Sequence, residues 1–493
     1  MHLQVEFALR IQTMGIRICV QIIVLLIFVL CGCSSNKVAE ASLECLPKAF
    51  PDYNEVVVPP NIAPLNFMVE DAEELLVSFR LDNRECFSVS SRDGLLKIPA
   101  DKWRNLLCEA IGGSIQIHVS VWNAEYPQGV AYQPITIQVA KDEIDRWMAY
   151  RLIEPGYQSW KQLGIYQRDI TSFEESLVVG NHSNARTCLN CHSFSGYAAD
   201  KWMFHARGAN GGTYIYKEGK ITKVNIEKIG LKKGASYPIW HPDGKLLTFS
   251  SNTTQQAFFE YGEQPLEVYD ERSDLIFYDT ETNEVFSDPR FLTAESMETY
   301  PAWSPDGTCL YYVSAEAKVL PKDYRNMHYH LLKVDFDPET RTFGEKIDTL
   351  YHAGNPAASV SYPRVSPDGR YLFYTLSSCG TFPIWHKEAD LGMMDLSRKQ
   401  HVDVSAWNSE ESDSYHAWSS NGRWVVFGSR RIDGRYTRLY LAHWDSEGKA
   451  GKPFLLPQED PRHNLWRLKS YNIPEFVREK VELPSSDFSS LAQ

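Results

Sequence analysis

Positive charge is scarce in this chain. It has 50 Lys and Arg residues against 63 Asp and Glu residues, which gives a formal net charge of -13, and the basic residues do not cluster. A protein that binds nucleic acid neutralises phosphates with grouped Lys and Arg. We therefore expect no nucleic-acid partner.

Long hydrophobic runs are also missing, apart from one near the start. The apolar run from Ile18 to Val29 is shorter than the roughly 20 residues that a helix needs to cross a bilayer. Arg10 and Arg17 precede it and Leu-Cys-Gly-Cys, ending at Cys33, follows it. This order of charged, apolar and small residues predicts an export signal, with an uncut membrane anchor as the alternative.

The end of this signal resembles a bacterial lipobox. In that family the last cysteine, here Cys33, becomes lipid-modified and forms the mature N-terminus. The resemblance implies a signal peptide at residues 1–33 and a lipid anchor to a membrane of the cell envelope, with the protein facing the periplasm. Residues 34–54 are polar and small, and we interpret them as a linker.

Common hydrolase motifs are absent. The sequence contains no Gly-x-Ser-x-Gly, no His-Glu-x-x-His and no Gly-rich phosphate loop. Hydrolytic chemistry is therefore not indicated, and a carrier or binding protein is favoured over an enzyme.

What the chain does contain predicts a mainly β protein. Aromatic residues make up 13% of it, and these side chains fit a pleated, half-buried surface. Apolar residues alternate with polar ones at Ile115, Ile117 and Val119, and again at Ile135 and Ile137. This alternation predicts a small β-sandwich at residues 55–140, which by default would be a stalk or docking module.

A helical segment is expected next. Ile144, Trp147, Met148, Arg151 and Leu152 recur at helical spacing, and a Pro-Gly pair would end that helix. We assign residues 141–210, which contain this helix and the motif described below, to a short helical haem-binding segment.

The second half of the chain repeats itself. Tyr-Pro-x-Trp-x-Pro-Asp-Gly begins at Tyr237 and at Tyr300, a variant without Trp begins at Tyr362, and a looser copy begins at Tyr415. In the recurring Ser-Pro-Asp-Gly form, Pro presets a turn angle, Asp can bond to the backbone two residues on, and Gly accepts a left-handed angle. Each copy therefore predicts a β-hairpin.

These repeats resemble those of the TolB family of β-propellers. The resemblance implies a propeller of five or six blades at residues 211–480. A further blade is expected at residues 211–225, with residues 464–476 as its closing strand. The motif described next is foreign to that family, so a role in the Tol envelope system is not carried over.

Cys188, Cys191 and His192 form a Cys-x-x-Cys-His motif. This motif is typical of c-type haem attachment, in which two thiols bond to the haem and the histidine binds the iron. It predicts one covalent haem c with His192 as the proximal ligand. The alternatives are a redox disulfide pair, which would need a βαβ context, and half of a zinc site, which would need a second ligand pair.

The sixth iron position has two candidates downstream. We favour His205 as the distal ligand and keep Met203 as the alternative, and Arg207 could pair with a haem propionate. An open iron site is the third case.

These features predict an exported, lipid-anchored cytochrome that transfers electrons. Its propeller would dock a redox partner protein or a small ligand. The second hypothesis is a TolB-like binding or scaffold lipoprotein in which the haem is structural or sensory, and the third is a haem enzyme with an open iron site.

Overall fold

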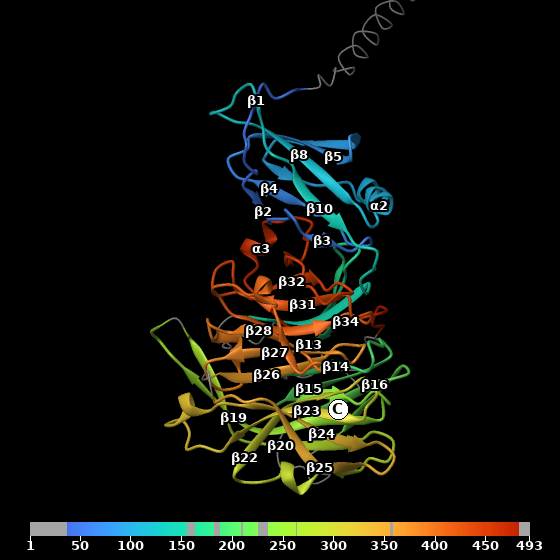
Figure 1. Cartoon of the computed structure of the whole chain (residues 1–493), viewed down its shortest axis with the longest axis vertical. Helices are drawn as coiled ribbons and strands as arrows, with labels where there is room; N and C mark the ends of the chain where they lie inside the picture. Colours follow the sequence, from blue (N-terminus) through green and yellow to red (C-terminus); the bar gives the residue numbers. More distant parts are fainter. Residues whose placement is uncertain are drawn as a thin grey trace, which may run out of the picture.

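A computed structural model describes residues 37–482, apart from 155–162, 182–187, 209–210, 225–234, 263 and 355–357. The described chain is mainly β and has two parts, an N-terminal domain at one end and a larger propeller (Figure 1). The predicted export signal, including Cys33, lies outside the described residues. Within them, no helix has both the length and the apolar character to span a membrane.

The N-terminal domain contains two sheets that share one hydrophobic core. Seven strands form the larger sheet: β1 (Ala41–Ser42), β3 (Val57–Val58), β5 (Glu74–Leu81), β6 (Arg84–Ser91), β8 (Ser114–Trp122), β9 (Val130–Ala131) and β10 (Ile135–Val139). Three form the smaller: β2 (Ala49–Phe50), β4 (Phe67–Val69) and β7 (Leu95–Leu96). Alternate residues of β5 and β8 are buried because successive side chains of a strand point to opposite faces.

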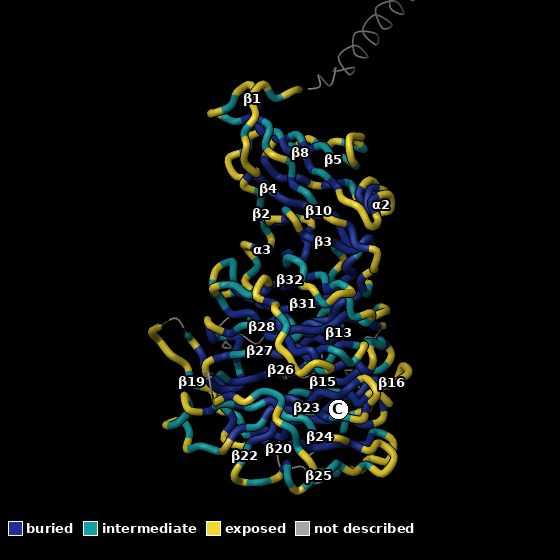
Figure 2. The backbone as a smooth tube through the Cα atoms, in the orientation of Figure 1, coloured by how far each residue is buried: buried dark blue, intermediate teal, exposed yellow. Residues whose placement is uncertain are grey.

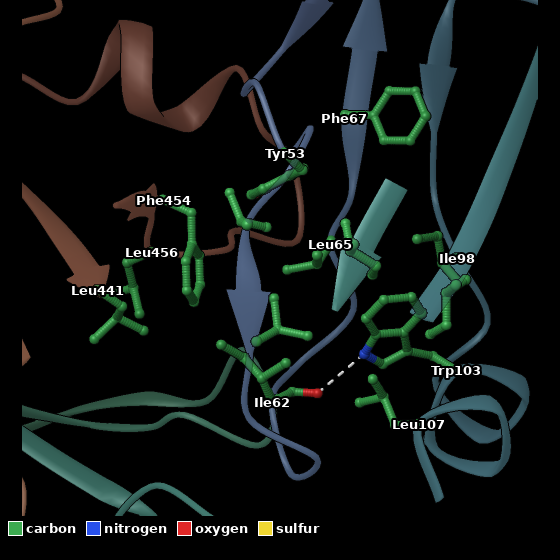
Figure 3. Close-up of a cluster of buried hydrophobic side chains, with 14 of the residues drawn as sticks. Tyr53, Ile62, Leu65, Phe67, Ile98, Trp103, Leu107, Leu441, Phe454 and Leu456 are labelled. Carbon is green, nitrogen blue, oxygen red and sulfur yellow. Dashed lines mark hydrogen bonds between the residues drawn. The ribbon is translucent and has the colours of Figure 1, made fainter. Parts of the chain in front are cut away.

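Helix α2 (Ala100–Glu109) covers this core and was not expected from the sequence. Trp103, Leu106 and Leu107 are buried on one face of the helix. The indole Nε1 of Trp103 donates a 3.0 Å hydrogen bond to the carbonyl oxygen of Ile62, as Figure 3 shows. The helix forms because apolar residues three and four apart can all face one core.

The predicted linker at residues 34–54 is wrong for its described part. Residues 37–54 include β1 and β2, and the side chain of Tyr53 is buried in the core. Strand pairing with β9 and β4 holds this stretch against the domain, so polar composition alone did not make it a free tether.

Six four-stranded antiparallel sheets form the propeller. We number these sheets, or blades, by the chain order of their innermost strands, and each blade is given from its innermost strand outward. The first blade has β14 (Cys188–Phe194), β15 (Lys201–Arg207), β16 (Gly212–Lys217) and β17 (Lys220–Val224), and the second has β18 (Ser236–Trp240), β19 (Leu246–Phe258), β20 (Leu266–Asp279) and β21 (Val285–Phe286). The third blade has β22 (Ser296–Trp303), β23 (Cys309–Glu316), β24 (His330–Asp337) and β25 (Thr342–Tyr351). The fourth has β26 (Ser359–Val365), β27 (Tyr371–Ser377), β28 (Asp390–Asp395) and β29 (Gln400–Val402); the fifth has β30 (Asp413–Trp418), β31 (Trp424–Ser429), β32 (Arg438–His443) and β33 (Phe454–Leu455); the sixth has β34 (Ser470–Val477), β11 (Trp147–Ile153), β12 (Gly164–Asp169) and β13 (Glu175–Gly180). Short helices in the loops are η4 (Pro289–Phe291), η5 (Tyr324–Asn326), η6 (Pro383–Trp385), η7 (Ser405–Trp407) and α3 (His463–Trp466).

The innermost strands make a closed ring. β14, β18, β22, β26, β30 and β34 contact one another in that order, and β34 returns to β14. The described chain is therefore a six-bladed β-propeller, within the predicted five or six. The C-terminal strand does close a blade, but it pairs with β11 and not with the strands near residues 211–225.

The helix predicted from Ile144 is wrong. Residues 147–153 form strand β11, which lies between β12 and β34 in its sheet. Both faces of β11 pack against other parts of the protein, so Trp147, Met148, Ala149 and Tyr150 are all buried. A strand buried on both faces lacks the alternation that distinguishes it from a helix. The predicted haem-binding segment is consequently not helical: its described residues belong mostly to β11–β15, and the propeller begins at Trp147.

The hairpin prediction is confirmed at the repeats. In the third blade, the amide of Gly307 donates a 2.9 Å hydrogen bond to the carbonyl oxygen of Ser304, and Gly307 has a φ of 73°. Equivalent turns join the first two strands of the second, fourth and fifth blades. Each repeat therefore marks the same inner hairpin of its blade.

A bulge precedes each of these hairpins. The tyrosine that begins each repeat has a positive φ, between 49° and 52°, at Tyr237, Tyr300, Tyr362 and Tyr415. Adjacent rings lie 3.9, 4.3 and 4.5 Å apart between centroids, in that order around the propeller. This left-handed conformation is costly for a tyrosine, and the contacts between neighbouring tilted rings, of which Tyr237 is half-buried and the other three are buried, offset that cost.

The N-terminal domain packs directly on the propeller. Leu441, Phe454 and Leu456 of the fifth blade lie beside Tyr53 in one core, as Figure 3 shows. Figure 2 shows burial continuing from the N-terminal sheets into the blades, whereas the exposed residues lie on projecting loops. The amide of Asn66 adds a 2.9 Å hydrogen bond to the carbonyl oxygen of Glu459. The interface is therefore both apolar and hydrogen-bonded.

Candidate functional site

The Cys-x-x-Cys-His motif lies on β14, the innermost strand of the first blade. The pairing of β14 with β15 shifts register between Leu189 and His192, as the pairing of β18, β22, β26 and β30 does at the first two residues of each repeat. Asn190 and Cys191 therefore occupy the Tyr-Pro positions, and His192 occupies the position after them. The motif is a modified copy of the propeller repeat.

The imidazole of His192 is fully buried and has no hydrogen-bond partner among the described residues at either ring nitrogen. Its Nε2 atom is 3.9 Å from Oε1 of Glu475, which is beyond hydrogen-bonding distance. Burial, with a smaller effect from the charge of Arg151, lowers the pKa of His192 to about 3. The ring is therefore neutral at pH 7. A buried polar group without a partner is costly, so such a group requires an explanation.

The two thiols of the motif are free. Cys191 is buried and Cys188 is half-buried. Arg151 of β11 holds this strand in place, because its Nη1 atom donates hydrogen bonds to the carbonyl oxygen of Leu189 at 3.1 Å and to Oδ1 of Asn190 at 3.0 Å. The strand that carries the motif is thus held in place, and neither thiol is part of a disulfide.

The residue types of the motif match those of c-type haem attachment, whereas strand pairing places Cys188 opposite Arg207 and His192 opposite Phe204, which lie on different faces of the sheet by alternation. An iron ligand must be a neutral imidazole, and His192 is neutral and has no competing partner. Two free thiols precede it at the spacing that the attachment motif requires. No set of three or more His, Cys, Asp or Glu residues within the described ranges is placed to hold a separate metal ion.

The predicted distal ligand is not brought near His192. His192 lies opposite Phe204 in the pairing of β14 with β15. Directly opposed side chains share a face of the sheet and neighbouring ones alternate, so His205 and Met203 lie on the other face. There, Met203 packs in the core with Trp240.

His205 has its own partner on that face. Its Nδ1 atom is 3.2 Å from Oγ1 of Thr213, and burial lowers the pKa of His205 to about 3, with a smaller effect from Arg207. Arg207 itself is exposed and lies opposite Cys188 in the strand pairing. By alternation Arg207 shares the face of His205, and its Nη2 atom donates a 3.3 Å hydrogen bond to Oγ of Ser236 in the second blade. The structure therefore places Arg207 beside Cys188 but, like His205, not on the face of His192.

The position of His192 recurs in every blade and forms a ring, which we call the channel ring. Its members lie two residues after the bulge residue of each innermost strand: His192, Ile239, Ala302, Arg364, Ala417 and Glu475. Except for His192, all of them line one cavity of about 440 Å³. We call it the channel cavity.

Sequence reasoning missed the charged residues of the channel ring. Arg364 was within a recognised repeat, but its position was not compared between copies. Glu475 lies in a degenerate copy, Ile473-Pro474-Glu475-Phe476, in which Ile473 has the same positive φ of 49° as the tyrosines. The Pro at the second position was the signal that could have found it.

Burial raises the pKa of Glu475 to about 7, while the amide of Phe194 and the charge of Arg364 act in the opposite direction. That amide donates a 3.0 Å hydrogen bond to Oε2 of Glu475. Glu475 therefore connects two features of the site, since one of its oxygens faces His192 while its side chain lines the channel cavity.

Comparisons with known proteins give structural likeness at low sequence identity. No protein-family model and no curated protein matches the chain. Among solved structures, TolB from Acinetobacter baumannii aligns at 15% identity over 77% of this chain and 85% of that one, with a TM-score of 0.43. A hypothetical selenium-binding protein from Sulfolobus tokodaii aligns at 10% identity over 70% and 96%, with a TM-score of 0.44.

A third solved structure, the hydrazine synthase of Kuenenia stuttgartiensis, aligns at 12% identity over 57% of this chain and 73% of that one, with a TM-score of 0.32. Likeness at this level does not bear on activity, ligand or partner. The propeller architecture is established by the strand order and the closed ring of innermost strands.

Proposed function

We propose that this protein is an exported, lipid-anchored c-type cytochrome with one covalent haem at Cys188, Cys191 and His192. The observation that carries the proposal is the buried, neutral and unpartnered imidazole of His192, which directly follows two free thiols at the attachment spacing. Haem c supplies a one-electron redox couple when bound.

The residues of the chain have distinct roles in this proposal. Cys188 and Cys191 would hold the macrocycle, and His192 would bind the iron. Arg151 fixes the strand that carries them through its bonds to Leu189 and Asn190. The exposed Arg207 beside Cys188 is the candidate partner for a haem propionate.

The remaining parts have supporting roles. The propeller would present a docking face to a redox partner protein, and the N-terminal domain, which we interpret as a β-sandwich, would act as a stalk or docking module above the lipid anchor at Cys33. The channel cavity favours a second function, that of a TolB-like periplasmic binding or scaffold lipoprotein in which the haem is structural or sensory.

The test is to express the full chain with a cytochrome c maturation system and stain the denatured protein for haem on a gel. We expect a stained band in the wild type and in Cys45→Ser, whose cysteine is exposed and distant from the motif in sequence. Cys188→Ser together with Cys191→Ser should abolish the stain. An unstained wild-type band would refute haem attachment.

A reduced-minus-oxidised spectrum separates the two functions. A reversible α-band that an external one-electron donor restores would support electron transfer. A stained protein whose iron does not exchange electrons with soluble donors would support the structural or sensory role.

A further inference from the structure

Besides His192, the channel ring has two ionisable side chains, Arg364 and Glu475, and Arg364 is the one with apolar neighbours on both sides. Its counterparts in the neighbouring third and fifth blades are Ala302 and Ala417, and in the second blade Ile239, whereas the fourth blade has Arg364. The two alanines flank Arg364 around the ring. Small residues on both sides leave space beside the guanidinium, and that space is part of the channel cavity.

Arg364 forms no close ion pair with a carboxylate within the described part of the chain, although Glu475 of the same cavity affects its pKa. Among the described residues, the only hydrogen bond that its side chain donates runs from Nη1 to the carbonyl oxygen of the preceding Pro363, at 2.9 Å. No carboxylate lies within 4.0 Å of it among the described residues. Burial lowers the pKa of Arg364, although the guanidinium stays charged at neutral pH. Glu475 of the same cavity interacts electrostatically with Arg364 but forms no ion pair with it within 4.0 Å, and its raised pKa of about 7 leaves it only partly ionised at neutral pH. The charge of the half-buried guanidinium is therefore incompletely compensated, so this residue is placed to receive a further negative group.

The walls of the channel cavity are largely aromatic. Trp240, Trp303, Trp418 and Phe194 line it, and so does Tyr197, whose ring lies 5.8 Å from the guanidinium of Arg478. Flat aromatic walls bind ring-shaped apolar groups, and arginines bind carboxylates and phosphates through paired hydrogen bonds.

A volume of about 440 Å³ is within the range of small-molecule sites. The prolines of three hairpin turns, Pro242, Pro305 and Pro367, also line the cavity, which places it at the turn end of the innermost strands.

We propose that the channel cavity binds a small organic anion, with a carboxylate or phosphate on a flat ring-bearing body, and that Arg364 is the residue that recognises its charge. Arg478 adds a second positive charge at the rim. The aromatic walls enclose the body of the ligand.

This inference does not depend on haem attachment. Cys188, Cys191 and His192 are not among the residues that line the channel cavity. The protein can therefore bind the anion whether or not haem is present, and failure of the haem test leaves the binding test unchanged.

The experiment titrates the full matured chain with three probes, benzoate, phenyl phosphate and the neutral benzamide, and follows tryptophan fluorescence, since three tryptophans line the cavity. We expect at least one anion to bind about tenfold or more tightly than benzamide, because paired charge-assisted hydrogen bonds from an arginine are stronger than the bonds that a neutral amide can form. Stronger binding of phenyl phosphate than of benzoate would identify a phosphate ester as the natural class, and the reverse order a carboxylate.

Arg364→Ala should weaken anion binding about tenfold or more and leave benzamide binding unchanged. Arg398→Ala is the matched control, because Arg398 is an exposed arginine in the turn after β28 of the same blade. Ala302→Leu fills the cavity without removing a charge and should weaken binding of all three probes.

Thermal unfolding of each variant verifies that it is folded. If Arg364→Ala is folded and binds benzoate and phenyl phosphate as tightly as the wild type, the proposal is wrong. It is equally overturned if the wild type binds neither anion at millimolar concentration.

Discussion

The guanidinium of Arg151 donates a 2.7 Å hydrogen bond from Nη2 to Oδ1 of Asn472, although the two residues are 321 positions apart in the chain. The same side chain bonds to Leu189 and Asn190 through Nη1. It thus joins the sixth blade, which is built from both ends of the propeller sequence, to the first blade, which carries the cysteine motif.

Replacing Arg151 with Met should therefore weaken the closure of the propeller. The change leaves three buried or half-buried acceptors without their donor, and we expect the free energy of unfolding to fall by about 2–4 kcal/mol. Urea denaturation followed by tryptophan fluorescence measures this. Arg398→Met, which changes an exposed side chain, should alter the free energy of unfolding by less than about 0.5 kcal/mol. Equal effects of the two variants would show that the closure does not depend on Arg151.

The opposite faces of His192 and His205 lead to a spectroscopic prediction. If haem is attached at Cys188 and Cys191, His205→Ala should leave the position and spin state of the visible bands unchanged, because His205 lies on the far side of the sheet and bonds to Thr213. Met203→Leu should behave in the same way. His192→Ala should alter both. A shift to high-spin bands in His205→Ala would mean that the sheet rearranges around the haem.

A buried histidine far from the cysteine motif makes stability depend on pH. Nε2 of His386 is 2.9 Å from Oε2 of Glu267, and its Nδ1 is 3.2 Å from Oε1 of Glu388. Burial lowers the pKa of His386, but the hydrogen bonds to these two carboxylates outweigh it and raise the pKa to about 9.

The raised pKa means that the folded protein holds this proton more tightly than the unfolded chain, whose histidine titrates near 6.5. The stabilisation is complete below about pH 6.5 and is lost as the pH rises through about 9. We expect the free energy of unfolding to fall by about 2–3 kcal/mol over that interval, as measured by urea denaturation at several pH values.

His386→Gln should flatten this dependence, whereas His352→Gln, which changes an exposed histidine, should keep it. If the free energy of unfolding of His386→Gln still falls with pH as in the wild type, the pH dependence comes from other groups.

The lipobox predicts where the protein is held. Cys33→Ser should remove incorporation of labelled palmitate and release the protein from membranes after a salt wash, because the thiol that accepts the lipid is lost. Cys31→Ser changes a cysteine in the same signal and should keep both properties. Membrane retention of Cys33→Ser would indicate an uncut anchor in place of a lipid.

Local chemistry made much of the propeller predictable. The turns after Trp240, Trp303 and Trp418 follow from the angles that Pro, Asp, Asn and Gly accept, and the structure has hairpins there. The same reasoning failed at residues 144–152, because burial on both faces of β11 comes from β34 and the neighbouring blades, which are distant in the sequence.

The candidate site, like the fold, was predictable from the sequence only in part. The spacing of Cys188, Cys191 and His192 is a property of the sequence, and so is the haem prediction that it carries. The choice of His205 rested on closeness in sequence, and strand alternation removes it from the face of His192.

The sequence by itself determined the repeat, its turns, the mainly β character and the cysteine motif, because each depends on residues within a few positions of one another. Only the tertiary structure decided that six blades close through β34, that the motif is a copy of the repeat on an innermost strand, and that Arg364 faces a cavity without a close ion pair to a described carboxylate. These depend on contacts between strands as much as 300 residues apart, whose register and burial no local pattern encodes.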